Sequence, residues 1–229
     1  MANIAFKMNY CDGGITNQNV GFNGICSDEM IEYNIELQKN AWCSNEICLC
    51  KQYWDFEITR TELEDNWQPE YNGPFVCYES CALRDWIASA GINSIGRIRH
   101  FNFSEELPNH LCVLTTVNPE DKRGNRVIFA MFLIDKVIIN KYDYSHCVTA
   151  DKKYRLQFYP KEMKKAKFWS VYRNAVRPSK KRWVSGLYRY FEDEDAVQFL
   201  KMALEIKRGT AEESLAAEFL NHYCKIHNI

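Results

Sequence analysis

The cysteines in the first part of the chain are the residues whose type and spacing could do chemistry. The chain has ten cysteines in 229 residues, and those that we consider together are Cys26, Cys43, Cys48, Cys50, Cys77 and Cys81. Thiolates that converge on one point hold zinc, another soft ion or an iron–sulfur cluster. The spacings C-x4-C, C-x-C and C-x3-C differ from the paired C-x2-C knuckles of structural zinc sites. We therefore predict a metal centre, a 4Fe-4S cluster or Zn2+, with the irregular spacing favouring the cluster.

Four of these cysteines are the predicted ligands: Cys26, Cys43, Cys50 and Cys77. We expect only one of Cys48 and Cys50 to face the centre, and Cys50 is the better placed because a turn follows it. Cys77 lies before a predicted helix, whose dipole would stabilise a thiolate. Cys26 lies at another loop-to-helix junction. Cys48 and Cys81 stay as alternates, and the alternative for the whole set is that these are buried thiols that only pack.

A second candidate site follows from the distribution of charge. The net charge is −1, but residues 1–85 carry 14 acidic against 5 basic side chains, and residues 151–186 carry 12 basic against 2 acidic ones. A basic segment interleaved with aromatic rings is typical of nucleic-acid binding, because cations neutralise phosphates while rings stack on bases. The alternatives are a solvated surface and one that docks on the acidic N-terminal part.

The segment 168–191 concentrates these rings and cations. The residues that we expect to contact DNA or RNA are Trp169, Arg173, Arg177, Lys180, Lys181, Arg182, Trp183, Tyr188 and Arg189. A pocket for a flipped base holds it between rings, and Trp169, Trp183 and Tyr188 are suited to that role. The alternative for each ring is a place in the core.

The elements around the cysteines are predicted to be helical. Residues 1–25 read as a loop-rich start because D12-G-G14 and N23-G24 signal turns. We predict helices over 28–39, over about 60–66, where Thr59 and Glu62 have the form of a capping box, and over 78–90, with Gly91 as the terminating residue. Residues 1–96 would thus form a helical, cysteine-rich, metal-binding region.

Strands are expected in the second part of the chain. Alternating or continuous apolar runs predict strands over 110–117, over 126–135, which should be the central strand, and over 147–159, with a short helix from Pro160. Two helices, 193–207 and one from Thr210, should finish the chain as a packed pair. The predicted fold class is α+β, a small and mostly antiparallel β-barrel or curled sheet with flanking helices, and the second domain would span 97–229.

The order of a strand, the apolar strand ending F129-A-M-F-L-I-D-K136, a further strand and the basic aromatic segment resembles the PUA-like barrel superfamily, and within it the EVE and ASCH type domains. The resemblance covers about residues 97–190. It implies a barrel that binds nucleic acid, since several of these domains bind modified bases in DNA or RNA.

Other sequence patterns limit the classes of function that we expect. No run of 18 apolar residues and no signal peptide are present, so we expect a cytoplasmic protein with reduced thiols and no membrane partner. His222 and His227 are five residues apart and do not share a helix face. No catalytic triad, phosphate-binding glycine loop or paired carboxylates can be recognised. The sequence predicts a nucleic-acid-binding protein with a structural four-cysteine centre; the alternative is a metal-dependent or iron–sulfur enzyme acting on nucleic acid or nucleotides.

Overall fold

The computed structural model describes residues 3–14, 21–68, 70, 73–91, 97–102, 105–121, 124–139, 145–174, 178–183 and 186–229. The chain divides into two compact units. One, here called the sheet unit, comprises Met1–Met8, Asn102–Val137 and Val148–Ile229. The other, here called the cysteine unit, comprises Asn9–Phe101 and Ile138–Cys147. Each is described by itself.

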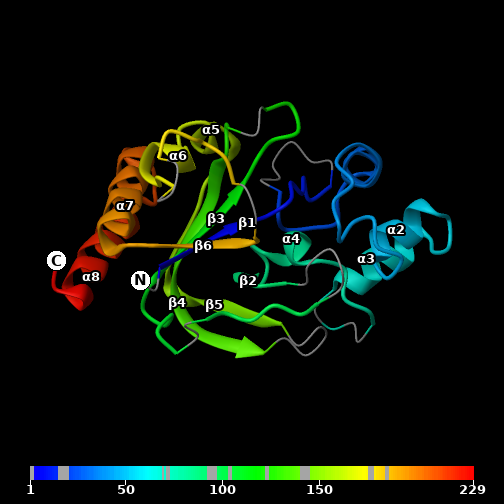
Figure 1. Cartoon of the computed structure of the whole chain (residues 1–229), viewed down its shortest axis with the longest axis horizontal. Coiled ribbons are helices and arrows are strands. Elements are labelled where there is room, and N and C mark those ends of the chain that lie inside the picture. The colour runs from blue at the N-terminus through cyan, green and yellow to red at the C-terminus, as the bar shows by residue number, and fades with distance from the viewer. Residues whose placement is uncertain are drawn as a thin grey trace. The chain divides into compact units, whose positions relative to one another are not determined.

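A mixed, curled sheet is the main β structure (Figure 1). Its strands pair in the order β2-β5-β4-β3-β1-β6. In sequence order their bounds are β1 (Asn3–Lys7), β2 (Ile87–Ser89), β3 (Leu111–Thr116), β4 (Val127–Ile139), β5 (His146–Gln157) and β6 (Tyr188–Phe191). β1 is parallel to β3 and antiparallel to β6, while β3 and β4 are antiparallel with a register shift at Leu114/Thr115. The predicted α+β class with a curled sheet is confirmed at this level.

The centre of the sheet follows directly from its apolar sequences. All six residues of β3 are buried, and so are the first eight residues of β4. A strand that is covered on both faces reads as a continuous apolar run rather than as an alternating one. β4 lies between β3 and β5, as its sequence predicts for a central strand, and its residues become exposed from Asp135 onward.

The N-terminal segment and the segment after Cys77 differ from the sequence expectation. The N-terminal segment was expected to be a loop, but β1 lies between β3 and β6, with Asn3, Ile4, Ala5 and Phe6 all buried. The helix expected over 78–90 is wrong beyond its first turn, since helix α4 ends at Cys81 and β2 follows. Trp86 has a left-handed φ of 50°, which ends any helix, and the Ala90 N–H then donates to the His146 carbonyl at 2.8 Å.

The helices of the cysteine unit are all short. They are α1 (Asp28–Glu32), which continues as the π-helical turn η1 (Tyr33–Leu37), α2 (Leu49–Trp54), α3 (Arg60–Trp67) and α4 (Tyr78–Cys81). The predicted capping box at the start of α3 is confirmed, because the Thr59 hydroxyl accepts from the Glu62 N–H at 3.2 Å and the Glu62 carboxylate accepts from the Thr59 N–H at 2.7 Å. Helices this short are marginal on their own.

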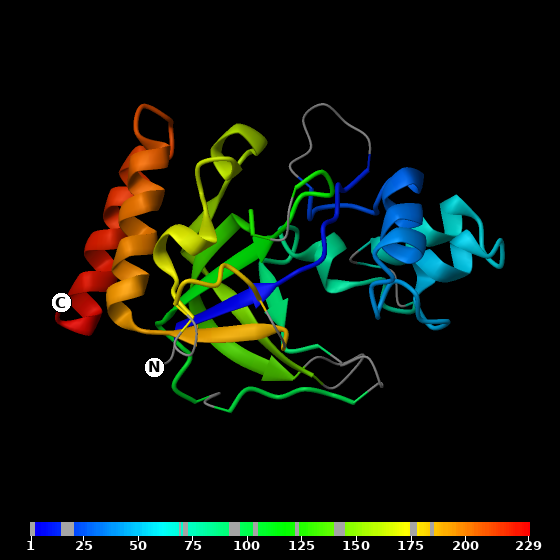
Figure 2. The same cartoon turned by 45° about the horizontal axis from the view of Figure 1, so that its top comes forward.

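The sheet unit carries longer helices at its C-terminal end. Its helices are α5 (Pro160–Met163), α6 (Phe168–Val171), α7 (Asp193–Lys207) and α8 (Glu213–His227). Figure 2 shows α7 and α8 lying side by side. Among the described residues, no helix has both the length and the apolar character needed to cross a bilayer.

A fully buried lysine joins the end of α7 to its surroundings. The Lys207 ammonium donates to the Gln157 carbonyl at 2.6 Å and to the carboxylates of Glu162 at 2.8 Å and Glu212 at 2.6 Å. Its side chain is 0% exposed, and the two carboxylates are 16% and 35% exposed. These contacts connect α7 with the end of β5, with α5 and with the residue that precedes α8.

Replacing Lys207 by alanine should therefore lower the free energy of unfolding. We expect a loss of about 3 kcal/mol, which is the lower end of the range for breaking a buried ion pair. The lower end applies because both carboxylates still reach solvent. Lys201→Ala, an exposed lysine of the same helix, should change it by less than about 0.5 kcal/mol. Denaturant unfolding monitored by circular dichroism measures both. Equal effects of the two substitutions would contradict a stabilising role for the buried cluster.

Candidate functional site

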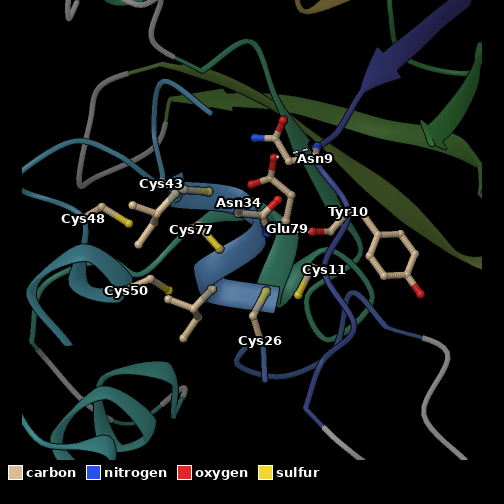
Figure 3. Close-up of a pocket in the computed structure, with 12 residues that line it drawn as sticks. Asn9, Tyr10, Cys11, Cys26, Asn34, Cys43, Cys48, Cys50, Cys77 and Glu79 are labelled. Atoms are coloured by element: carbon tan, nitrogen blue, oxygen red, sulfur yellow. Dashed lines mark hydrogen bonds between the residues drawn. The ribbon is translucent and has the colours of Figure 1, made fainter. Parts of the chain in front are cut away.

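Six cysteines line one pocket within the cysteine unit (Figure 3). They are Cys11, Cys26, Cys43, Cys48, Cys50 and Cys77, and we call this the cysteine pocket. Its other lining residues include Ile31, Ile35, Asn34 and Glu79. All four predicted ligands are therefore brought together, with the alternate Cys48. Cys11, which the sequence argument did not include, is the sixth.

Turns and helix starts place these thiols, as their sequence context indicates. Cys26 precedes Ser27, the N-cap of α1, whose hydroxyl accepts from the Met30 N–H at 3.2 Å. Cys77 is itself the N-cap of α4, and its Sγ accepts from the Ser80 N–H at 3.3 Å. A thiol at a helix N-cap lies where backbone N–H groups stabilise negative charge. The sequence positions of these two cysteines are thus explained by the local backbone.

Cys48 and Cys50 both line the pocket, against the expectation that only one faces it. Strand geometry does not support that expectation, because residues two apart in an extended backbone share a face. In the structure Cys48 is the extended N-cap of α2 and Cys50 lies within its first turn. The backbone enters the helix at Leu49, and both sulfurs face the same pocket (Figure 3).

Cys81 lies outside the cysteine pocket. Its thiol donates to the Cys77 carbonyl at 2.9 Å, and its side chain is 3% exposed. Burial raises the pKa of Cys81 to about 12. This alternate ligand therefore packs as a small apolar residue, which is the common fate of a buried cysteine.

The electrostatics of the cysteine pocket keep most of its thiols neutral. Burial raises the pKa of Cys77 and of Cys43, and the nearby Glu79 carboxylate raises both further. The pKa of Cys48 is lowered, first because the Cys50 thiol donates toward it and also because N–H groups at the start of α2 face it. A soft cation would be the countercharge that allows the other thiols to ionise, so binding would release protons.

The type and spacing of the donor atoms determine which metal the pocket could hold. Sulfurs around a single zinc ion, with bonds of about 2.3 Å, lie about 3.8 Å apart. In the described part of the chain, no three thiols have their sulfurs within 4.8 Å of one another. A zinc ion would thus require the side chains to turn inward, whereas a cluster takes one thiol for each iron around a larger body. The cavity is about 20 Å³, about the space of one water, so a cluster would move the lining outward.

The basic aromatic segment belongs to the sheet unit, where its members differ in exposure. Trp169 and Trp183 are each 8% exposed, and their rings lie 6.4 Å apart in a T-shaped arrangement. Tyr188 and Arg189 are half-buried in β6. The exposed cations are Arg173, Lys180, Lys181 and Arg182, and Arg177 lies outside the described residues. The two tryptophans therefore belong mostly to the core.

Arg126, which the sequence argument missed, lies against Trp183 of this segment. Its side chain is 6% exposed, and its Nη1 donates to the carbonyl and the hydroxyl of Thr115 at 3.2 and 3.1 Å. The guanidinium groups of Arg126 and Arg189 lie 5.1 and 5.3 Å from the centre of the Trp183 ring. The Nε of Arg126 has no hydrogen-bond partner among the described residues. Burial lowers the pKa of Arg126 to about 10, and its position just before an apolar strand was the available sequence signal.

No protein-family model, curated protein or solved structure matches this chain. The function must therefore be argued from the cysteine pocket and from the surroundings of Trp183.

Substitution of a pocket cysteine should remove bound metal and loosen the cysteine unit. Cys77→Ser should lower the iron or zinc content per chain and increase proteolysis within residues 9–101, because binding energy at such a site contributes to folding. Cys81→Ser and Cys224→Ser, both outside the pocket, are the matched controls and should keep the metal. Elemental analysis and an anaerobic absorption spectrum separate a brown cluster from colourless zinc. Folded wild-type protein that contains neither metal would contradict the prediction.

Proposed function

We propose that the protein binds DNA or RNA through its sheet unit, while a thiolate-held metal centre stabilises its cysteine unit. The observation that carries the nucleic-acid part is the buried Arg126 guanidinium, with its unpartnered Nε, above the Trp183 ring. Unsatisfied buried donors and exposed positive charge support this proposal.

Unsatisfied buried donors require a reason. A buried polar atom without a partner costs roughly 1–3 kcal/mol, more when the group is charged. Besides the Arg126 Nε, the indole N–H of Trp169 is buried and has no hydrogen-bond partner among the described residues. Both belong to side chains that lie beside the Trp183 ring. An acceptor-rich ligand, such as a phosphate or the edge of a base, would satisfy them.

The exposed cations that directly precede Trp183 in the sequence suit a phosphate backbone. Lys180, Lys181 and Arg182 are exposed, and within the described ranges none forms an ion pair. Neutralising phosphates with such side chains releases counterions from the nucleic acid. Charge of this kind gives affinity and orientation without reading the sequence of bases.

The role of the rings is refined by their contacts. The Trp183 indole N–H donates to the Gly186 carbonyl at 3.0 Å, which fixes its edge. We propose that Trp183 orients Arg126 and Arg189, and that the half-buried Tyr188 is the ring that stacks on a base. The PUA-like resemblance would make that base a flipped or modified one.

The metal centre is proposed as a structural element of the cysteine unit. The pocket cysteines come from the loop before α1, from the loop before α2, and from the starts of α2 and α4, so one centre would connect all these segments. A 4Fe-4S cluster is favoured over Zn2+ by the number of thiols and because, among the described residues, no three sulfurs lie within 4.8 Å of one another. When bound, a thiolate-held centre supplies cross-links, and a cluster adds the capacity for one-electron transfer.

Glu79 favours a second candidate function, that of a metal-dependent enzyme. Its carboxylate lines the cysteine pocket and accepts from the Asn9 N–H at 3.1 Å, and burial raises its pKa. A carboxyl group beside a metal is suited to proton transfer. Glu79→Gln that leaves nucleic-acid binding and any turnover unchanged would exclude this role.

Nucleic-acid affinity should fall steeply with salt. The log–log slope is expected to be about −0.7 to −0.9 for each phosphate neutralised. Replacing Lys180, Lys181 and Arg182 together by alanine should flatten this slope and weaken all sequences alike. Replacing Tyr188 by alanine should cost roughly 1–3 kcal/mol with little change in slope, as expected for a stacked base.

A control triple substitution tests whether the position of the charge matters. Lys201, Arg208 and Lys225 are exposed cations of α7, its C-cap and α8. Replacing these three by alanine changes the net charge equally and should leave the slope within error. Fluorescence anisotropy with single-stranded, duplex and modified-base oligonucleotides measures each binding curve. Wild-type protein that binds none of them at low salt would remove the proposal.

A further inference from the structure

Three side chains from distant parts of the chain converge at a second place, within the sheet unit. His110 precedes β3, Asp193 is the first residue of α7 and His227 is the last residue of α8. One nitrogen or oxygen of each lies within 4.8 Å of the others, and all three residues are half-buried. The rings of His110 and His227 are 4.6 Å apart between centroids.

Backbone carbonyls orient both histidines. The His110 Nδ1 lies 3.2 Å from the Pro108 carbonyl, and the His227 Nε2 lies 2.9 Å from the Asn109 carbonyl. A ring nitrogen next to a carbonyl is the one that carries the proton, because a carbonyl can only accept. The other nitrogen, Nε2 of His110 and Nδ1 of His227, is then the one with a free lone pair. A donated N–H of this kind is what orients most metal-binding histidines.

The carboxylate of Asp193 is held by two fully buried residues. Its Oδ1 accepts from the Asn3 side-chain amide at 2.7 Å and lies 2.8 Å from the Tyr223 hydroxyl. The Asn3 side-chain oxygen also accepts from the Leu111 N–H at 2.8 Å, next to His110 along the chain. These hydrogen bonds use Oδ1, which leaves Oδ2 for another partner. Among the described residues, neither histidine is hydrogen-bonded to this carboxylate.

We propose that His110, Asp193 and His227 bind one divalent transition-metal ion of the zinc class. Two imidazoles and a carboxylate match zinc, iron(II) and cobalt(II), whereas calcium and magnesium prefer oxygen ligands alone and copper(I) prefers sulfur. Three protein ligands leave at least one position for water, as in catalytic rather than structural zinc sites. The proposal goes beyond the nucleic-acid function and does not depend on it or on the cysteine pocket.

The test is a titration of the reduced full-length chain with Zn2+ and Co2+. Calorimetry should show that the wild type binds one ion at this site and that His110→Ala and His227→Ala no longer bind it. His222→Ala is the matched control, because His222 is also half-buried on α8 but stacks on Tyr154 with 4.3 Å between centroids. It should keep the full stoichiometry. A wild type whose stoichiometry equals that of both histidine variants would overturn the proposal.

Spectra separate this ion from one in the cysteine pocket. Cobalt held by nitrogen and oxygen gives weak visible bands, whereas cobalt held by thiolates adds an intense sulfur-to-metal band in the near ultraviolet. The histidine variants should lose the weak bands and keep the thiolate band, and Cys77→Ser should do the reverse. Wild-type protein that shows the weak bands without the thiolate band would therefore count against the cysteine centre and not against the histidine site.

A conservative substitution guards against variants that fail to fold. Tyr223→Phe keeps the buried ring but removes the hydroxyl beside Asp193, and loss of such an orienting bond typically weakens metal affinity about 10–100-fold. Melting curves without metal identify variants that are folded. Folded Tyr223→Phe that binds Co2+ as tightly as the wild type would contradict the role of Tyr223 in orienting the carboxylate; unchanged binding in folded His110→Ala would refute the site.

Discussion

The cost of ionising several buried thiols in one pocket is the constraint on which the cysteine unit depends. Six thiols line one small pocket, and burial holds the pKa of Cys43 and Cys77 well above the ordinary value. Such a set is either neutral and merely packed or charged around a cation. Because the helices of this unit are short and β2 has only three residues, hydrogen bonding within these elements contributes little stability by itself. A bound centre would supply the missing connections between its segments.

The sheet unit has a different basis for its stability. The buried runs of β3 and β4 form its core, and the buried Lys207 fixes the end of α7. Arg126 is the exception in this unit, a buried cation for which the described residues offer no carboxylate. Natural proteins keep such unsatisfied groups mainly where function requires them. This contrast with Lys207, whose charge is matched, is why Arg126 is central to the proposed nucleic-acid contact.

Local signals in the sequence predicted the elements that depend on local interactions. The capping box of Thr59 and Glu62 and the apolar run of β4 are of this kind. β1 could not be predicted, because its partner strands β3 and β6 lie more than a hundred residues away and its own sequence is short. The helix expected after Cys77 failed because pairing of the following residues with β5 overrides their helical propensity.

The candidate sites show the same limit. Cys26, Cys43, Cys50 and Cys77 could be grouped by residue type, and the structure places them in one pocket. The grouping of His110, Asp193 and His227 could not be predicted, because no spacing along the chain relates a residue before β3 to the ends of two helices. Arg126 was missed because a single cation just before an apolar strand is a common sequence pattern at the end of a strand. Its lack of a partner is visible only in three dimensions.

Mapping of thiol alkylation in the folded protein, with and without a strong metal chelator, tests the central claim most directly. If a metal centre occupies the cysteine pocket, Cys11, Cys26, Cys43, Cys48, Cys50 and Cys77 should be protected together and become reactive together when the chelator removes the metal. Cys112, fully buried in β3, should stay protected in both conditions, and the half-buried Cys224 should react in both. Pocket cysteines whose reactivity does not change on chelation would show that they only pack, and would contradict the account.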